Sequence, residues 1–224
     1  MMMNLFSIFD PSTSMNYSMN WISCIYLLMF LPLMYWFIPS RWNMFFMFIN
    51  NFLLGEFKVL MSSKLNKLNI LMYISLFFFI MLNNFMGLFN YIFTSTSHLV
   101  VTLSISMTFW FSYMIYGWLF NTNHMFIHLV PMGTPVILMP FMVLIETISN
   151  VIRPGTLAVR LAANMIAGHL LMTLISSTGP NLGFFFLVLM LFFQSLLIVL
   201  EISVALIQAY VFSVLSTLYS TESN

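Results

Sequence analysis

The chain has 224 residues, of which 62% are hydrophobic and only 5% are charged, and its formal net charge is +1. A soluble domain carries about 25% charged residues, so this sequence lacks the polar surface that a water-facing globule needs. The near-neutral charge also argues against nucleic acid as a partner, and the single cysteine, Cys24, excludes an internal disulfide. Because the apolar runs reach about 20 residues or more, we expect an all-α polytopic membrane protein.

The amino-terminal stretch, MMMNLFSIFDPSTS, has neither the basic region of a signal peptide nor the Arg-rich pattern of a transit peptide. Met (22 residues) and Phe (26 residues) are over-used throughout the chain. That bias is typical of an AT-rich genome, and an inner-membrane protein encoded within the mitochondrion would need no import signal. The composition therefore indicates a mitochondrial inner-membrane protein.

The first predicted span is 19–38, in which Pro32 is expected to introduce a kink. A connector over 41–67 follows, and its middle is too short to span, so we expect an interfacial amphipathic helix over about 42–60. The positive-inside rule places this connector in the matrix and the amino terminus in the intermembrane space. The connector holds most of the basic residues of the chain, namely Arg41, Lys58, Lys64 and Lys67.

Two further spans are predicted over 69–89 and 99–120. The last two apolar segments, 136–178 and 182–219, do not fit simple spans. A helix over 182–219 would be about 57 Å long, whereas the hydrocarbon core is about 30 Å thick. Since the turn between the two segments is short, we expect a long, tilted helical hairpin within a single membrane domain.

Arg160 is a permanent cation inside the first of these long segments. An arginine at mid-membrane costs roughly 2.5–3.5 kcal/mol on insertion scales, a penalty that usually persists only where the charge has a role. With the hairpin turn near residue 182, Arg160 should face roughly residue 204, with Glu201 and Gln208 each about one turn away. Asn164 lies four residues after Arg160, on the same helical face.

The chemistry of these side chains suggests proton transfer. A guanidinium keeps its proton, so Arg160 could stabilise a passing carboxylate and block a leak, but it could not relay protons. Glu201 and His169 can both titrate, and they would form a proton path from the intermembrane side. The alternatives are a structural ion pair between Arg160 and Glu201 and a hydrogen-bonded packing role for His169.

The remaining ionisable residues are harder to assign. Glu146 would line a second, matrix-facing path or be an interfacial carboxylate, and Arg153 is expected to snorkel to the interface. The i, i+4 pair His124 and His128 could bind a metal, but no third ligand is nearby, so an interfacial or access role is favoured. His98 lies in a predicted loop, and the sequence indicates no partner for it. The sequence contains no motif for a cofactor.

Several stretches resemble one known family. RLAANMIAGH (Arg160 to His169) and LEISVALIQAYVF (Leu200 to Phe212) are similar to the signature stretches of subunit a of F-type ATP synthase in its mitochondrial form. HMFIHLVPMGTP, NNFMGLFNYIFTSTSHL and VLSTLYS resemble the insect versions. Asn90 departs from the proline that is usual in the family.

This resemblance implies a stator beside a rotating ring of c subunits, joined to other membrane-sector and peripheral-stalk subunits in the lipid bilayer. Protons would reach a c-ring carboxylate facing Arg160 through one half-channel and leave through another. The family's essential arginine falls on Arg160 and its intermembrane-side channel residues fall on His169 and Glu201. Asn164 and Gln208 fall beside the arginine, and the matrix-side acid falls on Glu146. The resemblance implies no cofactor and no catalytic site for bond chemistry.

Two other functions share the composition. A proton-pumping subunit of a respiratory complex should show several intramembrane lysine and glutamate stations, but no lysine lies in a predicted span. A haem- or copper-binding subunit needs paired histidines on facing spans, and only His169 is deep.

Overall fold

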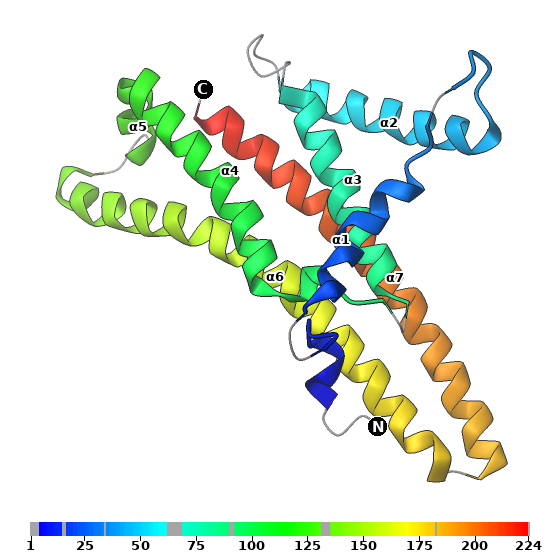
Figure 1. Cartoon of the computed structure of the whole chain (residues 1–224). Helices are drawn as coiled ribbons and strands as arrows, with labels where there is room; N and C mark the ends of the chain where they lie inside the picture. Colours follow the sequence, from blue (N-terminus) through cyan, green and yellow to red (C-terminus); the bar gives the residue numbers. More distant parts are fainter. Residues whose placement is uncertain are drawn as a thin grey trace.

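The computed structural model describes residues 5–14, 17–33, 35–61, 69–89, 92–130, 135–181 and 183–223, and these residues form an all-helical assembly (Figure 1). Four of its helices are long and apolar enough to cross a membrane. They are α3 (Ile70–Gly87), α4 (Leu99–Phe120), α6 (Met139–Thr178) and α7 (Phe184–Glu222). The prediction of an all-α polytopic membrane protein is confirmed.

The predicted spans 69–89 and 99–120 correspond closely to α3 and α4. A short 3-10 turn, η5 (Ser95–Ser97), lies between the two helices. A further helix, α5 (Thr122–Leu129), follows α4 after a single residue.

The predicted span 19–38 does not form one continuous helix. It contains η2 (Met19–Ile22), α1 (Ser23–Tyr26) and η3 (Leu27–Phe30), and the helical turns stop two residues before Pro32. Proline lacks an amide hydrogen and disfavours helical backbone in the residue before it, which accounts for the early end. This segment is therefore not one of the four helices of spanning length.

Helix α2 (Arg41–Leu60) occupies the region where an interfacial helix was expected. The Ser40 side chain caps its amino terminus by accepting a hydrogen bond from the Asn43 amide at 3.4 Å. Its buried face carries Phe46, Leu53 and Phe57, which pack into the main core. Lys64 and Lys67, which supported the matrix assignment of the connector, lie outside the described residues.

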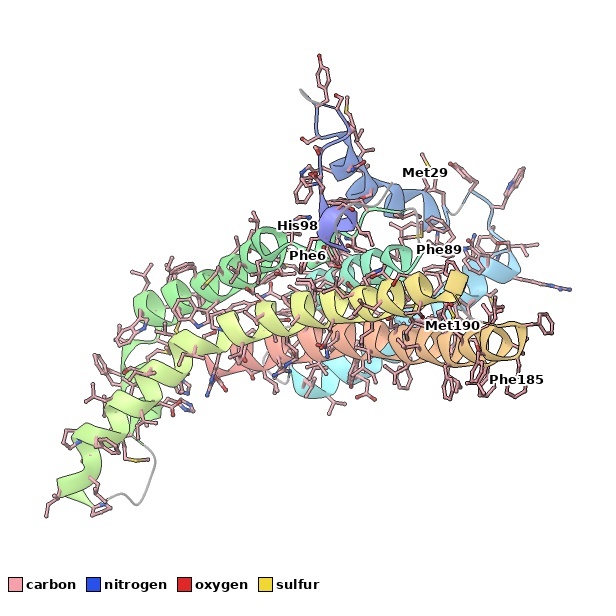
Figure 2. The ribbon with its side chains drawn as sticks, turned by 90° about the horizontal axis from the view of Figure 1, so that it is seen from below. Phe6, Met29, Phe89, His98, Phe185 and Met190 are labelled. Atoms are coloured by element: carbon pink, nitrogen blue, oxygen red, sulfur yellow. The ribbon has the colours of Figure 1, made fainter. Side chains whose placement is uncertain are left out.

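Helices α6 and α7 form the long hairpin, and each is close to its predicted length. The turn between them begins with η7 (Gly179–Asn181), which continues the path of α6 past Thr178. Figure 1 shows the two helices side by side to an end that projects from the other helices, and Phe185 and Met190 mark that end in Figure 2. Figure 2 also shows α6 bent in its first half, the part of the helix that contains Pro154.

The core lies where α3 crosses the second half of α7, away from the projecting end (Figure 1). Tyr73 and Ile80 of α3 pack there with Ala209 and Phe212 of α7. The Tyr73 and Tyr113 hydroxyls are 2.7 Å apart, which joins α3 to α4. The face of α7 at this crossing is built of small polar residues whose hydroxyls donate to backbone carbonyls three residues earlier: Ser213, Ser216, Thr217 and Ser220.

Candidate functional site

Helices α6 and α7 approach each other closely at Gly168 and Glu201. A Cβ atom added to Gly168 would stand only 2.8 Å from Glu201 Oε1, so a glycine is what allows the carboxylate to lie there. Glu201 is only 8% exposed. Neither of its carboxylate oxygens has a hydrogen-bond partner among the described residues. The hairpin therefore holds a buried carboxylate with which no described residue pairs.

His169 lies next in sequence and is also buried, with 7% of its surface exposed. Its ring packs edge-on against Phe9, with 6.4 Å between the ring centroids, and it lies beside the backbone of Gly87. Its Nε2 atom has no hydrogen-bond partner within the described parts of the chain. A buried polar atom that lacks a protein partner is usually hydrogen-bonded to another group, such as a water molecule.

A cavity of about 180 Å³ joins these groups. Its polar lining comes from His169, Glu201 and Asn164, and its remaining walls are mostly aliphatic. A cavity of roughly 10–15 Å³ can already hold one water molecule where polar partners exist. The space is therefore large enough for several waters between two groups that can titrate.

Arg160 does not line this cavity. It is exposed on α6, and it makes no hydrogen bond or ion pair with any residue that the structure describes. The alternative of a structural ion pair with Glu201 is therefore not formed. In a membrane protein, an exposed arginine on an apolar helix leaves room for a partner on another chain.

The register of the hairpin explains why Arg160 and Glu201 are separate. Gly168 approaches Glu201, and Gly179 approaches Met190 in the same antiparallel register. Extending that register puts Arg160 level with Ala209, so Gln208 is nearby while Glu201 lies about two turns away. The expectation that Arg160 is level with residue 204 was therefore wrong, since the two glycine contacts place Arg160 further along α7 and further from Glu201.

A second polar cluster lies on the other side of Arg160 along the hairpin. Arg153 Nη1 is 2.7 Å from Glu222 Oε2, and Arg153 Nη2 is 3.5 Å from Glu146 Oε1. The guanidinium also lies over the Tyr219 ring, 5.6 Å from its centroid. Arg153 was expected only to snorkel, but it links α6 to the carboxyl end of α7.

Glu222 was not among the residues that the sequence singled out. The hairpin register places it level with Thr147, beside Glu146, so antiparallel counting with the correct turn would have found it. Because the predicted register was wrong, this contact was missed as well.

Asn83 and Asn84 were also missed as site residues. Both are buried at the end of α3, and Asn84, at 1% exposure, has no hydrogen-bond partner for either side-chain polar atom within the described ranges. Gly87, one turn later, contacts Thr94 of the buried polar segment before α4. Two adjacent asparagines at the end of an apolar run were the signal in the sequence.

The other histidines pack against aromatic rings, and the buried Nε2 of His98 and Nδ1 of His124 also have no hydrogen-bond partner among the described residues. His124 and His128 pack edge-to-face, with ring centroids 4.6 Å apart, and His98 packs against Trp21 and Phe93. In the parts of the chain that the structure describes, no group of three or more His, Cys, Asp or Glu residues could hold a metal ion.

Comparison with known proteins gives one consistent result. The model of the family described as "ATP synthase A chain" matches residues 17–221. Similar proteins named "ATP synthase subunit a" occur in Drosophila melanogaster (57% identical over 224 residues, covering 100% of both chains) and in Locusta migratoria (58% over 223 residues, 99% of both). The one from Aedes aegypti is 58% identical over 229 residues and covers 100% of both chains. With its long apolar helices, the chain therefore belongs to the ATP synthase A chain family, as an insect-like, mitochondrial F-type member embedded in the membrane.

Proposed function

We propose that the chain forms two separate proton half-channels beside a ring of c subunits and so couples proton flow to rotation and ATP synthesis. The observation that carries this proposal is the layout of the hairpin. The cavity lined by Glu201 and His169, whose carboxylate oxygens and Nε2 atom have no partner among the described residues, lies on one side of Arg160. The Arg153 ion cluster lies on the other side.

The first half-channel runs from the intermembrane space to the His169 and Glu201 cavity. Asn84 and the polar segment Thr94–Ser97 extend it outward, because they add buried polar groups beside Gly87 and the α6 helix. Waters in such a space would hydrogen-bond to the unpartnered atoms. His169 and Glu201 then exchange protons with those waters and pass them to the ring.

Arg160 separates the two half-channels. It makes no ion pair with the described residues, so its guanidinium is available to a c-subunit carboxylate that arrives and releases its proton. Since the guanidinium holds its own proton, no proton crosses directly from one half-channel to the other. Asn164 and Gln208 flank this position and supply neutral hydrogen-bonding groups.

The second half-channel leads to the matrix past Glu146. Its carboxylate lies 3.5 Å from Arg153 Nη2, and the Glu222 carboxylate lies 2.7 Å from Nη1 of the same guanidinium. Protons released from the ring therefore meet a cluster of carboxylate oxygens at this outlet. This cluster supports the matrix-facing role for Glu146 over a purely interfacial carboxylate.

The proposed orientation places the amino terminus in the intermembrane space and the connector 41–67 in the matrix. Helices α6 and α7 are each longer than an upright span requires, so they lie tilted across the membrane. In a Cys24→Ser background, an impermeant maleimide should label Ser12→Cys from the outer face of the inner membrane. Lys58→Cys should react only in inverted vesicles, and the reverse pattern would contradict the orientation.

The half-channel assignment is tested by the double substitution His169→Ala with Glu201→Ala in the assembled ATP synthase. We expect proton flux driven from the intermembrane side to fall at least tenfold, because both titratable groups of the cavity are lost. Gln194→Ala, on α7 but outside the cavity lining, is the control and should leave flux unchanged. Undiminished flux in the double variant would refute this half-channel.

A further inference from the structure

A short segment near the amino terminus reaches the part of α6 that carries His169. This segment, η1 (Leu5–Phe9), is a 3-10 helix that lies against the second half of α6 (Figure 1). Phe9 is half-buried, and its ring meets the His169 imidazole edge-on, with 6.4 Å between the ring centroids. The matched family model covers residues 17–221, so it does not include η1. A segment outside the matched range therefore contacts a titratable residue of the proposed half-channel.

His169 lies between η1 and the cavity. Its imidazole is part of the cavity lining, whereas Phe9 contacts the same ring without lining the cavity. The Nε2 atom of His169 has no hydrogen-bond partner among the described residues, so packing against neighbouring groups helps to fix the ring. The two nitrogens of an imidazole are distinct, and the orientation of the ring decides which of them faces a given neighbour. The contact with Phe9 therefore bears on how His169 exchanges protons.

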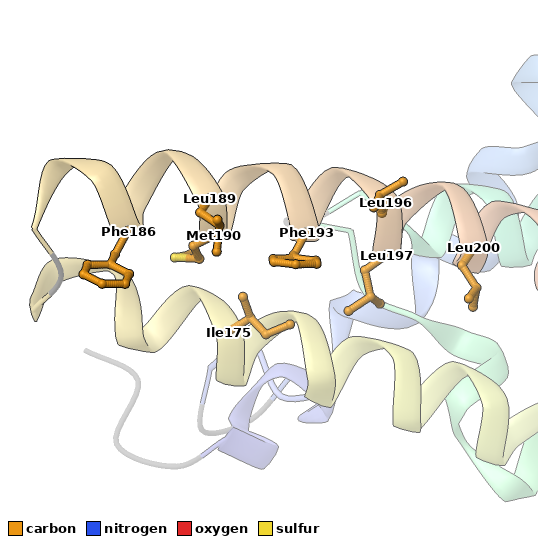
Figure 3. A pocket seen from close by; sticks show the side chains of 8 residues that line it. All are labelled: Ile175, Phe186, Leu189, Met190, Phe193, Leu196, Leu197 and Leu200. Atoms are coloured by element: carbon orange, nitrogen blue, oxygen red, sulfur yellow. The ribbon is translucent and has the colours of Figure 1, made fainter.

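The approach to the cavity from the hairpin turn is apolar. A groove between α6 and α7 continues from the cavity toward the turn, and Leu197 and Leu200 line both spaces. Figure 3 shows that the walls of this groove are hydrocarbon side chains and the thioether of Met190. Such walls offer water almost no hydrogen bonds, which makes them a poor path for protons. Exchange with His169 is therefore expected from the sides of α6 that contact η1 and the segment Thr94–Ser97.

Hydrogen bonds and ring packing connect η1 to the helices. The Asn20 side-chain amide donates to the carbonyl of Asp10, the residue after η1, at 3.2 Å. Trp21, next along the chain, packs against Phe93 with 5.4 Å between the ring centroids. Phe93 leads into the buried polar segment before α4, which itself contacts α6. The position of Phe9 is therefore fixed from a second point in the fold as well as by its own contact.

We propose that Phe9 is a positioning residue for proton transfer, whose ring holds the His169 imidazole in the orientation that exchanges protons with the cavity. A phenyl ring has no titratable group, so Phe9 carries no proton itself. Its influence on proton flux is exerted wholly through His169. The proposal rests on the proposed half-channel of His169 and Glu201.

The test measures proton flux from the intermembrane side in vesicles that carry the assembled ATP synthase. Phe9→Ala should lower this flux about fivefold, because the imidazole loses the ring that orients it. Phe9→Tyr keeps an aromatic ring and should retain most of the flux, whereas Phe9→Leu should not. Phe6→Ala is the matched control on η1, since Phe6 is 67% exposed, and it should leave the flux unchanged. Undiminished flux in the Phe9→Ala complex would overturn the proposal.

A double substitution separates positioning from a purely structural role. In a His169→Ala background, Phe9→Ala should lower the flux no further, because the group through which Phe9 acts is gone. The same fold loss in both backgrounds would overturn the proposal, since Phe9 would then act elsewhere. If the Phe9→Ala complex fails to assemble, Phe9→Leu provides the same comparison. Normal flux after replacement of both His169 and Glu201 would instead refute the half-channel itself.

Discussion

The α6–α7 hairpin holds its carboxylates in two different settings. Near the middle of the hairpin, Glu201 is buried beside Gly168 with no partner for its oxygens among the described residues. At the end away from the turn, Glu146 and Glu222 share Arg153 at 3.5 Å and 2.7 Å and are partly exposed. A buried polar group without a protein partner is usually hydrogen-bonded to water, whereas a carboxylate beside an arginine has its partner within the chain. One pair of helices therefore presents one buried carboxylate open to a further partner and two carboxylates that already have one.

We expect the largest loss of activity when Gly168 is replaced by a larger residue. Gly168→Val should reduce proton-driven ATP synthesis about 100-fold, because its side chain would displace Glu201 from the cavity. Synthesis by inverted vesicles, normalised to assembled complex, measures the effect. Gly155→Val is the control on the same helix, since a Cβ there meets nothing within 4 Å. Equal losses at both positions would show that the effect is not specific to Glu201.

Asn84→Leu tests whether protons reach the Glu201 cavity past the end of α3. We expect proton flux to fall about tenfold, because a polar group beside the proposed water path is lost. Thermal stability of the complex should stay the same or rise, since Asn84 makes no hydrogen bond with the described residues that the change would break. Lower stability with unchanged flux would indicate a structural role instead.

Arg153→Ala removes the guanidinium that Glu146 and Glu222 share, and it should have the smallest effect of these three substitutions. The ion pairs are partly exposed, so we expect each to contribute only about 0.2–1 kcal/mol to stability. ATP synthesis should fall no more than about fivefold, because Glu146 keeps its place on α6. A double-mutant cycle with Glu222→Ala, measured by thermal unfolding of the complex, isolates the pair. A coupling energy of zero would mean that the 2.7 Å contact contributes nothing.

The sequence predicted what depends on local apolar runs. The ends of α3 and α4 lie within about two residues of the predicted spans, because apolar runs of membrane length leave few alternatives. The hairpin was predicted from segment lengths. The prediction of one span over 19–38 was wrong, since composition alone could not show that the helical structure would end before Pro32.

Contacts across the hairpin were harder to predict because they depend on the position of the turn. The observed register differs from the one counted from the predicted turn, so Arg160 lies further from Glu201 than expected and the pairing of Arg153 with Glu222 was missed. The cavity at Glu201 also depends on one glycine, whose role is clear only when both helices are in place. Residue types thus indicated the candidates, and tertiary packing decided which of them lie together.

The most direct test of the central claim, that Arg160 separates two half-channels, is ATP synthesis and passive proton conductance in vesicles carrying Arg160→Ala. We predict an assembled complex that makes no ATP from a proton gradient, because no cation remains at this position to stabilise the ring carboxylate after it releases its proton. Passive conductance should rise, since the barrier between the half-channels is gone. Arg153→Ala is the matched control, in which synthesis should fall no more than about fivefold and stay coupled to the proton gradient. Normal coupled synthesis in the Arg160→Ala complex would contradict the account.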